Sequence, residues 1–273
     1  MSAQRLSEVF SRCRSEGRAA LVGYLTAGDP DVASSRELLA TLAKHVDILE
    51  VGMPFSDPMA DGPVIQAASE RALASGTKIS DVFTLTTELR STNPKLGIVL
   101  MGYANIAFAM GFEKFTERAV SAGADGVLLV DIPPEEGDIC DEIFARHGLD
   151  RILLLSPTST DERIRLACAK GSGFIYYVSL TGITGAEMGA IEGIHDKTSH
   201  IQSMTDMPVC VGFGIKTPEQ VAAVGAFADG VVVGSHFVSQ ITAQPDRNSI
   251  IHALDRSAQA MKNAIAEKKR EAN

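Results

Sequence analysis

The chain has 273 residues, and 45% of them are hydrophobic, which suits one large α/β domain or two small ones. Its 25 basic and 34 acidic residues give a net charge of −9, which argues against a nucleic-acid or anionic-membrane surface. The sequence has no secretory signal and no apolar run of about eighteen residues, so it predicts a cytoplasmic protein without a membrane span.

An amphipathic helix is predicted first, over Ser2–Glu16. Eight short apolar runs follow it, with helical stretches between them. The runs are continuous rather than alternating, as expected for parallel strands that are buried on both faces. The predicted strands are Ala20–Leu25, Val46–Val51, Gly97–Tyr103, Gly126–Asp131, Arg151–Leu155, Phe174–Ser179, Pro208–Gly212 and Gly230–Gly234.

The intervening helices are predicted to begin after polar residues that can accept hydrogen bonds from the first turn. These caps are Asp31, Ser80, Thr160 and Thr217, the last followed by Pro at the first helical position. No change of composition marks a second domain. Residues 264–273 at the end of the chain are expected to form a frayed tail.

Eight strand–helix units in this length predict an α/β fold, a single (β/α)8 TIM barrel over residues 1–273, with an extra N-terminal helix within residues 1–17. A doubly wound open sheet is the alternative. The barrel is favoured because no Gly-x-Gly-x-x-Gly follows the first strand. A short repeat also favours it, since Ala124–Val127 and Ala228–Val231 are both Ala-Asp-Gly-Val and precede strands four and eight.

The segment Val46–Pro63 carries the clearest chemical signal. Glu50 lies inside its apolar run, and Asp57 and Asp61 follow in a loop rich in Pro and Gly. A Glu within a buried strand is costly to ionise, so its pKa is expected to be shifted, as in general acid–base catalysts. The alternative is a structural Glu that is exposed on an edge strand or paired with an Arg.

The loops after strands six, seven and eight are rich in glycine. They contain the segment Ser179–Gly189, then Gly212–Gly214 and Gly234-Ser235. Glycine allows close backbone approach, and helices that start there direct N–H groups at an anion, so three such loops at one corner predict a phosphate site. The alternative is that they are ordinary tight turns. The length and Gly hinges of the loop after strand six also predict a lid.

Several kinds of chemistry lack the residues that they need. None of the ten lysines lies in a predicted strand, where a Schiff-base aldolase would place one, and strand six offers Tyr176 and Tyr177 instead. The four scattered cysteines and six histidines show no metal-ligand spacing. His236 is assigned to helix packing or the surface. These residues leave a phosphate-binding barrel that acts through carboxylates, with no metal and no cofactor.

Five segments resemble the tryptophan synthase α subunit family, and they follow the family order from the first strand to the eighth. They are Gly28–Pro30, Leu49–Gln66, Gly182–Glu187, Gly212–Ile215 with Thr217–Gln220, and Val233–Ser235. The resemblance implies cofactor-independent retro-aldol cleavage of indole-3-glycerol phosphate to indole and glyceraldehyde 3-phosphate. This agrees with a phosphate site and carboxylates without Lys or metal.

The resemblance also implies the site residues. Glu50 would be the main acid–base residue, and Asp61 would stabilise the positive charge that develops on the indole ring. Substrate contacts would come from residues near the indole ring, the glycerol portion, the lid and the phosphate. They are Tyr24, Leu129, Tyr176, Thr184, Gly185, Phe213, Gly214, Gly234 and Ser235. Phe174, His236 and the looser stretch Met101–Ile106 depart from the family pattern without touching Glu50 or Asp61.

By the same resemblance, the partner is a pyridoxal-phosphate β subunit in an α2β2 heterotetramer, contacted through the Pro54–Met59 loop. A stand-alone lyase that releases indole is the alternative. A phosphosugar isomerase would need an acid and a base on strands one and five, which end at Tyr24-Leu-Thr26 and Leu155-Ser-Pro157. A non-catalytic sensor is disfavoured by the presence of both Glu50 and Asp61.

Overall fold

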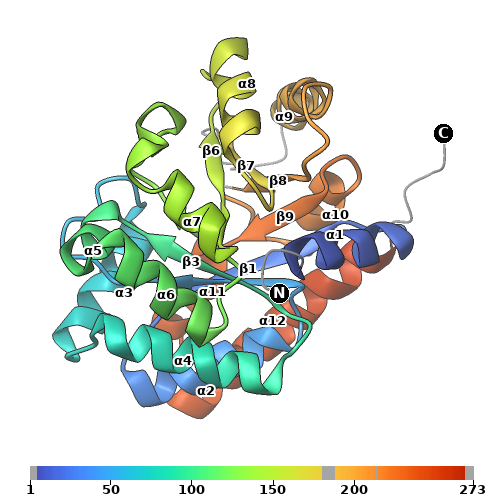
Figure 1. Cartoon of the computed structure of the whole chain (residues 1–273). Coiled ribbons are helices and arrows are strands. Elements are labelled where there is room, and N and C mark those ends of the chain that lie inside the picture. The colour runs from blue at the N-terminus through green and yellow to red at the C-terminus, as the bar shows by residue number, and fades with distance from the viewer. Residues whose placement is uncertain (1–4, 180–187, 213, 268–273) are drawn as a thin grey trace.

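A computed structural model of the chain describes residues 5–179, 188–212 and 214–267. All strands in these ranges belong to one parallel sheet, around which the helices are arranged (Figure 1). The strands are β1 (Ala20–Thr26), β2 (Ile48–Gly52), β3 (Gly97–Gly102), β4 (Gly126–Leu129), β5 (Asp150–Arg151), β6 (Leu153–Leu155), β7 (Ile175–Val178), β8 (Val209–Gly212) and β9 (Gly230–Val233).

The sheet closes on itself. Its strand order is β5-β4-β3-β2-β1-β9-β8-β7-β6, so β5 and β6 stand at the two ends of the order. Only Ile152 separates them in the chain, and they form the two halves of one strand. The first half pairs with β4 and the second with β7. The eight-stranded barrel predicted from the sequence is therefore confirmed, and the open doubly wound sheet is wrong.

Helices connect successive strands and cover the outside of the barrel. They are α1 (Arg5–Ser15), α2 (Val32–Ala43), α3 (Pro63–Ala74), α4 (Ile79–Thr92), α5 (Ala104–Met110), α6 (Phe112–Ala122), η1 (Pro134–Ile139), α7 (Asp141–His147), α8 (Asp161–Lys170), α9 (Met188–Gln202), α10 (Pro218–Gly225), α11 (Ser235–Ala243) and α12 (Arg247–Glu267). Within the described ranges, no helix combines the length and the apolar composition needed to cross a lipid bilayer.

Three of the four predicted helix caps are confirmed. The side chains of Asp31, Thr160 and Thr217 accept hydrogen bonds from the first turns of α2, α8 and α10. The prediction for Ser80 is wrong, because α4 already begins at Ile79. There the Asp81 carboxylate accepts a hydrogen bond from the Lys78 backbone N–H at 2.8 Å, and this contact fixes the start of the helix.

The last helix extends further than the sequence indicated. Helix α12 continues to Glu267, so fraying does not begin at residue 264. Its Ile265 is 2% exposed and packs in the outer apolar cluster between barrel and helices, which holds the last turn in place. Residues 268–273 lie outside the described residues.

Helix α1 closes the N-terminal end of the barrel. Its apolar face, which includes Leu6, Val9 and Phe10, packs with inward-facing strand residues such as Val22 and Ile48 in an inner cluster. The strand residues between these face outward and pack under the surrounding helices. Successive strand residues point to opposite faces. Together with this alternation, the inner cluster shows which positions of each strand face the barrel interior.

The Ala-Asp-Gly-Val repeat has a structural role at this same end. The carboxylate of Asp125 accepts a hydrogen bond from the Ile98 N–H of β3, and that of Asp229 accepts one from the Val209 N–H of β8. Asp47, which precedes β2, accepts one from Leu21 of β1 in the same way. Each Asp therefore joins the starts of two neighbouring strands.

Candidate active site

Glu50 lies inside the barrel. It follows Ile48 of the inner cluster by two positions on β2, so the alternation of the strand turns its carboxylate inward. Only 1% of the residue is exposed, and its Oε1 atom has no hydrogen-bond partner among the described residues. Burial without a counter-charge raises the pKa of Glu50 to about 8. The carboxyl group therefore carries a proton at neutral pH in the unliganded protein.

Two tyrosines share the interior with Glu50. Tyr24 lies directly beside it in the β1–β2 register, and its hydroxyl is 3.1 Å from that of Thr26. Tyr176 packs against the inner cluster from β7. Burial first, and the nearby Glu50 charge second, raise the pKa of Tyr176 well above its ordinary value. Both phenols stay protonated and can donate hydrogen bonds into the site.

The burial of Glu50 makes a prediction about stability. Because the folded state raises this pKa from 4.5 to about 8, it binds the proton more tightly than the unfolded state does. The stabilisation is fully present below the unfolded pKa and is lost as pH rises through the folded pKa. We expect the free energy of unfolding to fall more between pH 5 and pH 8 in the wild type than in Glu50→Gln, whose amide does not titrate. Urea titrations at both pH values measure this, and equal falls would contradict it.

Asp61 lies in the loop between β2 and α3, partly buried at the mouth of the barrel. The Tyr103 hydroxyl donates a hydrogen bond to its Oδ2 at 3.0 Å and accepts one from the Ala60 N–H, also at 3.0 Å. The Tyr103 ring in turn stacks on Phe55 at a centroid distance of 5.0 Å. Burial raises the pKa of Asp61, against the opposing effect of the Tyr103 hydrogen bond.

Tyr103 is a site residue that the sequence reasoning missed. It stands directly after β3, where side chains of a barrel enzyme converge, and that position is the signal that could have identified it. The loose family match of this stretch obscured it. Because Tyr103 binds both the Asp61 carboxylate and the backbone beside it, the loop after β3 orients the loop after β2.

The Gly28–Pro30 motif is used in a structural contact. The Asp29 carboxylate, 1% exposed, forms two 2.7 Å hydrogen bonds with the Arg71 guanidinium on α3. Gly28 has a positive φ of 82°, and a Cβ there would collide with Thr77. These contacts attach the loop after β1 to α3, the helix that follows Asp61. They therefore help to hold the Asp61 loop in place.

The expected phosphate corner lies where β8 and β9 end. Gly234 caps the N-terminus of α11, which begins at Ser235 and presents backbone N–H groups there. Among the described residues, a Cβ on Gly234 would come no closer than 3.5 Å to another atom, so packing against them does not demand glycine here. At Gly214, by contrast, the positive φ of 76° favours glycine. His236 points away, with Nε2 2.7 Å from the Ser257 hydroxyl on α12, as helix packing predicts.

One expected indole contact points elsewhere. Leu129 belongs to the outer cluster, whereas its neighbour Leu128 lies in the inner cluster and Val130 packs against that cluster. The expected indole contact at Leu129 is therefore one residue out of register, because strand alternation turns Leu128 and Val130 inward and Leu129 outward. Three further expected residues, Thr184, Gly185 and Phe213, lie outside the described residues, as does most of the expected lid.

Fold and site geometry together define the class: a (β/α)8-barrel enzyme whose C-terminal mouth holds a buried protonated Glu and a second carboxylate. The sequence model of the tryptophan synthase alpha chain family matches residues 10–266. The tryptophan synthase alpha chain of Marinobacter nauticus is 46% identical over 263 residues, 96% of this chain and 97% of that one. That of Zymomonas mobilis is 44% identical over 273 residues, covering 98% of both.

Solved structures agree with these matches. Tryptophan synthase subunit alpha from Legionella pneumophila superposes with a TM-score of 0.89 at 37% identity, covering 97% of this chain and 99% of that one. A chain of tryptophan synthase from M. tuberculosis gives 0.86 at 32% identity, covering 96% and 98%. The chain belongs to the tryptophan synthase alpha chain family. It is a lyase that cleaves indole-3-glycerol phosphate in tryptophan biosynthesis, and chains of this family work with a β subunit.

Proposed function

We propose that Glu50 moves both protons of the cleavage. In its protonated form it donates a proton to indole C3, which turns the ring into an iminium-like form. The resulting carboxylate then takes the proton of the glycerol hydroxyl as the carbon–carbon bond breaks. The bond's electron pair returns to the ring, and indole and glyceraldehyde 3-phosphate result. The proton count balances, because Glu50 ends as it began.

The raised pKa of Glu50 is the observation that carries this proposal. A carboxyl group with a pKa of about 8 holds its proton at neutral pH and is a far better acid–base catalyst there than a solvated Glu. Asp61, held by Tyr103, is proposed to accept the indole N–H hydrogen bond and balance the ring charge. Incubation with indole-3-glycerol phosphate, with indole assayed with and without a β subunit, tests the reaction.

The phosphate corner is proposed to be built from backbone N–H groups at Gly234 and Ser235, together with Gly214. Gly234→Val should raise the KM at least about tenfold, because the valine side chain occupies the space that the phosphate needs. The fold should survive, since a Cβ here would lie 3.5 Å or more from the described atoms around it. Steady-state kinetics with a far-ultraviolet circular dichroism control measure this, and an unchanged KM would contradict it.

The contact with the β subunit is proposed to include the Pro54–Met59 loop, in an α2β2 assembly. Exposed apolar side chains support this surface. Met59 is 81% exposed on that loop, Phe108 is 72% exposed on α5, and Ile139 is 56% exposed on η1. All three follow neighbouring strands at the same end of the barrel. The surface reaches the active site, because the loop leads directly into Asp61.

Phe108→Ser should weaken the affinity for the β subunit and leave the activity of the isolated chain unchanged. An exposed aromatic residue contributes little to the fold but anchors interfaces strongly, and a loss of about tenfold or more is expected. Leu73→Ser is the matched control, since Leu73 is 37% exposed in the last turn of α3, where the neighbouring Arg71 contacts the loop after β1 and not the loops after β3 and β4. Titration of each variant with the β subunit measures the affinity. Equal losses of affinity in Phe108→Ser and Leu73→Ser would count against this surface.

A further inference from the structure

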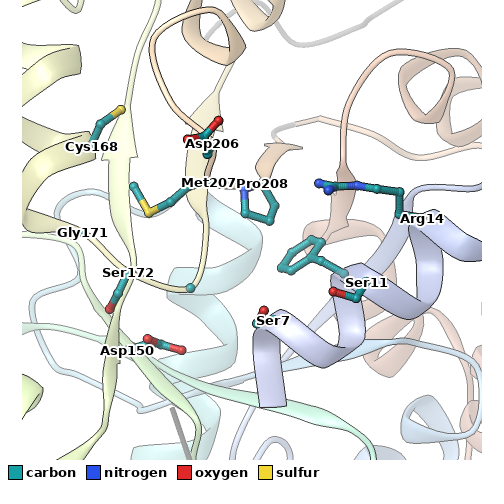
Figure 2. Close-up of a pocket in the computed structure, with 12 residues that line it drawn as sticks. Ser7, Ser11, Arg14, Asp150, Cys168, Gly171, Ser172, Asp206, Met207 and Pro208 are labelled. Atoms are coloured by element: carbon teal, nitrogen blue, oxygen red, sulfur yellow. The ribbon is translucent and has the colours of Figure 1, made fainter. Parts of the chain in front are cut away.

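A cavity of about 520 Å³ lies at the other end of the barrel from Glu50 (Figure 2). This volume falls within the range of about 300–1,000 Å³ that is typical of small-molecule pockets. One face of α1 forms one wall, and the segments that lead into β5, β7 and β8 form the other. The lining residues that matter here are Phe10, Arg14, Asp150, Ser172, Asp206 and Met207.

Asp150 is a buried carboxylate without a cationic partner among the described residues. It is 8% exposed. Two other buried acids at this end of the barrel, Asp47 and Asp125, are each paired with Arg or Lys side chains. Asp150 has only the hydroxyl of Ser172, which also accepts a hydrogen bond from the Arg151 N–H at 2.9 Å. A buried, unpaired carboxylate is costly, so a cation in the cavity would relieve that cost.

Burial is the main cause that raises the pKa of Asp150 to about 6; the hydrogen bond from Ser172 opposes the shift, and the nearby charge of Asp125 adds to it. The group is therefore ionised at pH 8. An ammonium ion has access to it from the cavity, because Asp150 is among the residues that line the space.

Arg14 supplies the opposite charge on the opposite side. Figure 2 shows its guanidinium extending from α1 toward the cavity, on the side away from Asp150. Within the described ranges no carboxylate lies at ion-pair distance from Arg14. Phe10 and Met207 add apolar surface to the lining of the cavity. The cavity is thus complementary to a molecule with an ammonium group at one end, a short apolar chain and a carboxylate at the other.

We propose that this cavity is a binding site for a small aminocarboxylate whose ammonium group pairs with Asp150 and whose carboxylate pairs with Arg14. The short carbon chain lies against Phe10 and Met207. Arg14 and Asp206 are both exposed at the rim, where water screens their charges, so the buried Asp150 is expected to contribute most of the selectivity. The site is independent of the chemistry at Glu50, so it is testable by binding alone.

Cys168 provides the readout, because it lies in the cavity wall and is partly exposed. Cys13, Cys140 and Cys210 are at most 1% exposed, so a thiol reagent at pH 8 should modify Cys168 first. Three compounds of equal chain length serve as probes: ε-aminocaproate, hexylamine and hexanoate. We expect ε-aminocaproate to slow the labelling at a concentration at least about tenfold lower than hexanoate, which lacks the contact to buried Asp150, and about threefold lower than hexylamine, which lacks only the contact to exposed Arg14.

Variants then assign each end of the ligand. Asp150→Asn should weaken protection by ε-aminocaproate about tenfold or more and make it no better than hexanoate. Arg14→Gln should make it no better than hexylamine. Asp206→Asn is the matched control, and protection there should be unchanged. Labelling rates without ligand and circular dichroism report on the fold of each variant.

Two results would overturn the proposal. One is equal protection by all three compounds, or an equal loss in Asp206→Asn and Asp150→Asn, since either would show that the paired charges do not select the ligand. The other is no protection by any compound together with no binding heat in calorimetry, which would show that the cavity holds only water.

Discussion

Glu50→Gln is expected to lower the turnover of indole-3-glycerol phosphate by roughly 10²–10⁴-fold, the usual contribution of a positioned acid–base group. The amide preserves the size and polarity of the side chain but cannot donate a proton to indole C3 and then take one from the hydroxyl. Since Glu50 has no hydrogen-bond partner among the described residues, the substitution breaks no described contact in the protein. Substrate affinity should therefore change much less than turnover.

The measurement is single-turnover release of indole, with the dissociation constant of the substrate determined separately. Glu50→Asp is the companion variant. It keeps a carboxyl group that can carry the proton, but its side chain is one methylene shorter, so the proton lies further from the indole ring. It should retain more activity than Glu50→Gln. If Glu50→Gln turned over within about threefold of wild type, the acid–base role would pass to another group in the interior.

The strand positions could be predicted because a buried parallel strand is a continuous apolar run. The predicted Ala20–Leu25 and Gly126–Asp131 differ from β1 and β4 by one or two residues at one end. The same feature allowed the burial of Glu50 to be predicted, because a Glu inside such a run has no route to solvent. That its pKa is shifted was expected from the sequence, and the structure adds the direction, which is upward because of burial.

A continuous apolar run conceals which of its residues face inward. Val127, Leu128, Leu129 and Val130 are all apolar, and only closure of the barrel determines that Leu128 and Val130 face the interior. This is why the expectation for Leu129 was displaced by one residue. An alternating strand would have shown its phase in the sequence.

The contact between Tyr103 and Asp61 could not be predicted for a different reason. The two residues are 42 positions apart, and their hydrogen bond depends on how two loops after neighbouring strands fold together. The same holds for the cavity beside Asp150, whose walls come from the first helix and from three distant segments. Local patterns indicate elements, whereas contacts between loops follow only from the assembled barrel.

Asp61→Asn is expected to lower turnover on the order of 10²–10³-fold, as for loss of one preorganised electrostatic contact to a developing charge. The amide has the same size and can still bond with the Tyr103 hydroxyl, so the loop keeps its shape. What it lacks is the negative charge opposite the ring nitrogen when indole C3 is protonated. The loss should therefore appear in turnover with substrate and hardly at all in the affinity for glycerol 3-phosphate, which has no indole.

Tyr103→Phe separates the charge of Asp61 from its orientation. It removes the 3.0 Å hydrogen bond but keeps the ring that stacks on Phe55, so the loop retains its apolar support. We expect a loss of about tenfold, smaller than that of Asp61→Asn, and little further loss when the two changes are combined, because both act through one carboxylate. Losses that multiply in the double variant would mean that Tyr103 contacts the substrate independently. An equal loss of affinity for substrate and glycerol 3-phosphate in Asp61→Asn would mean that the loop has collapsed, and Asp61 would then be a structural residue.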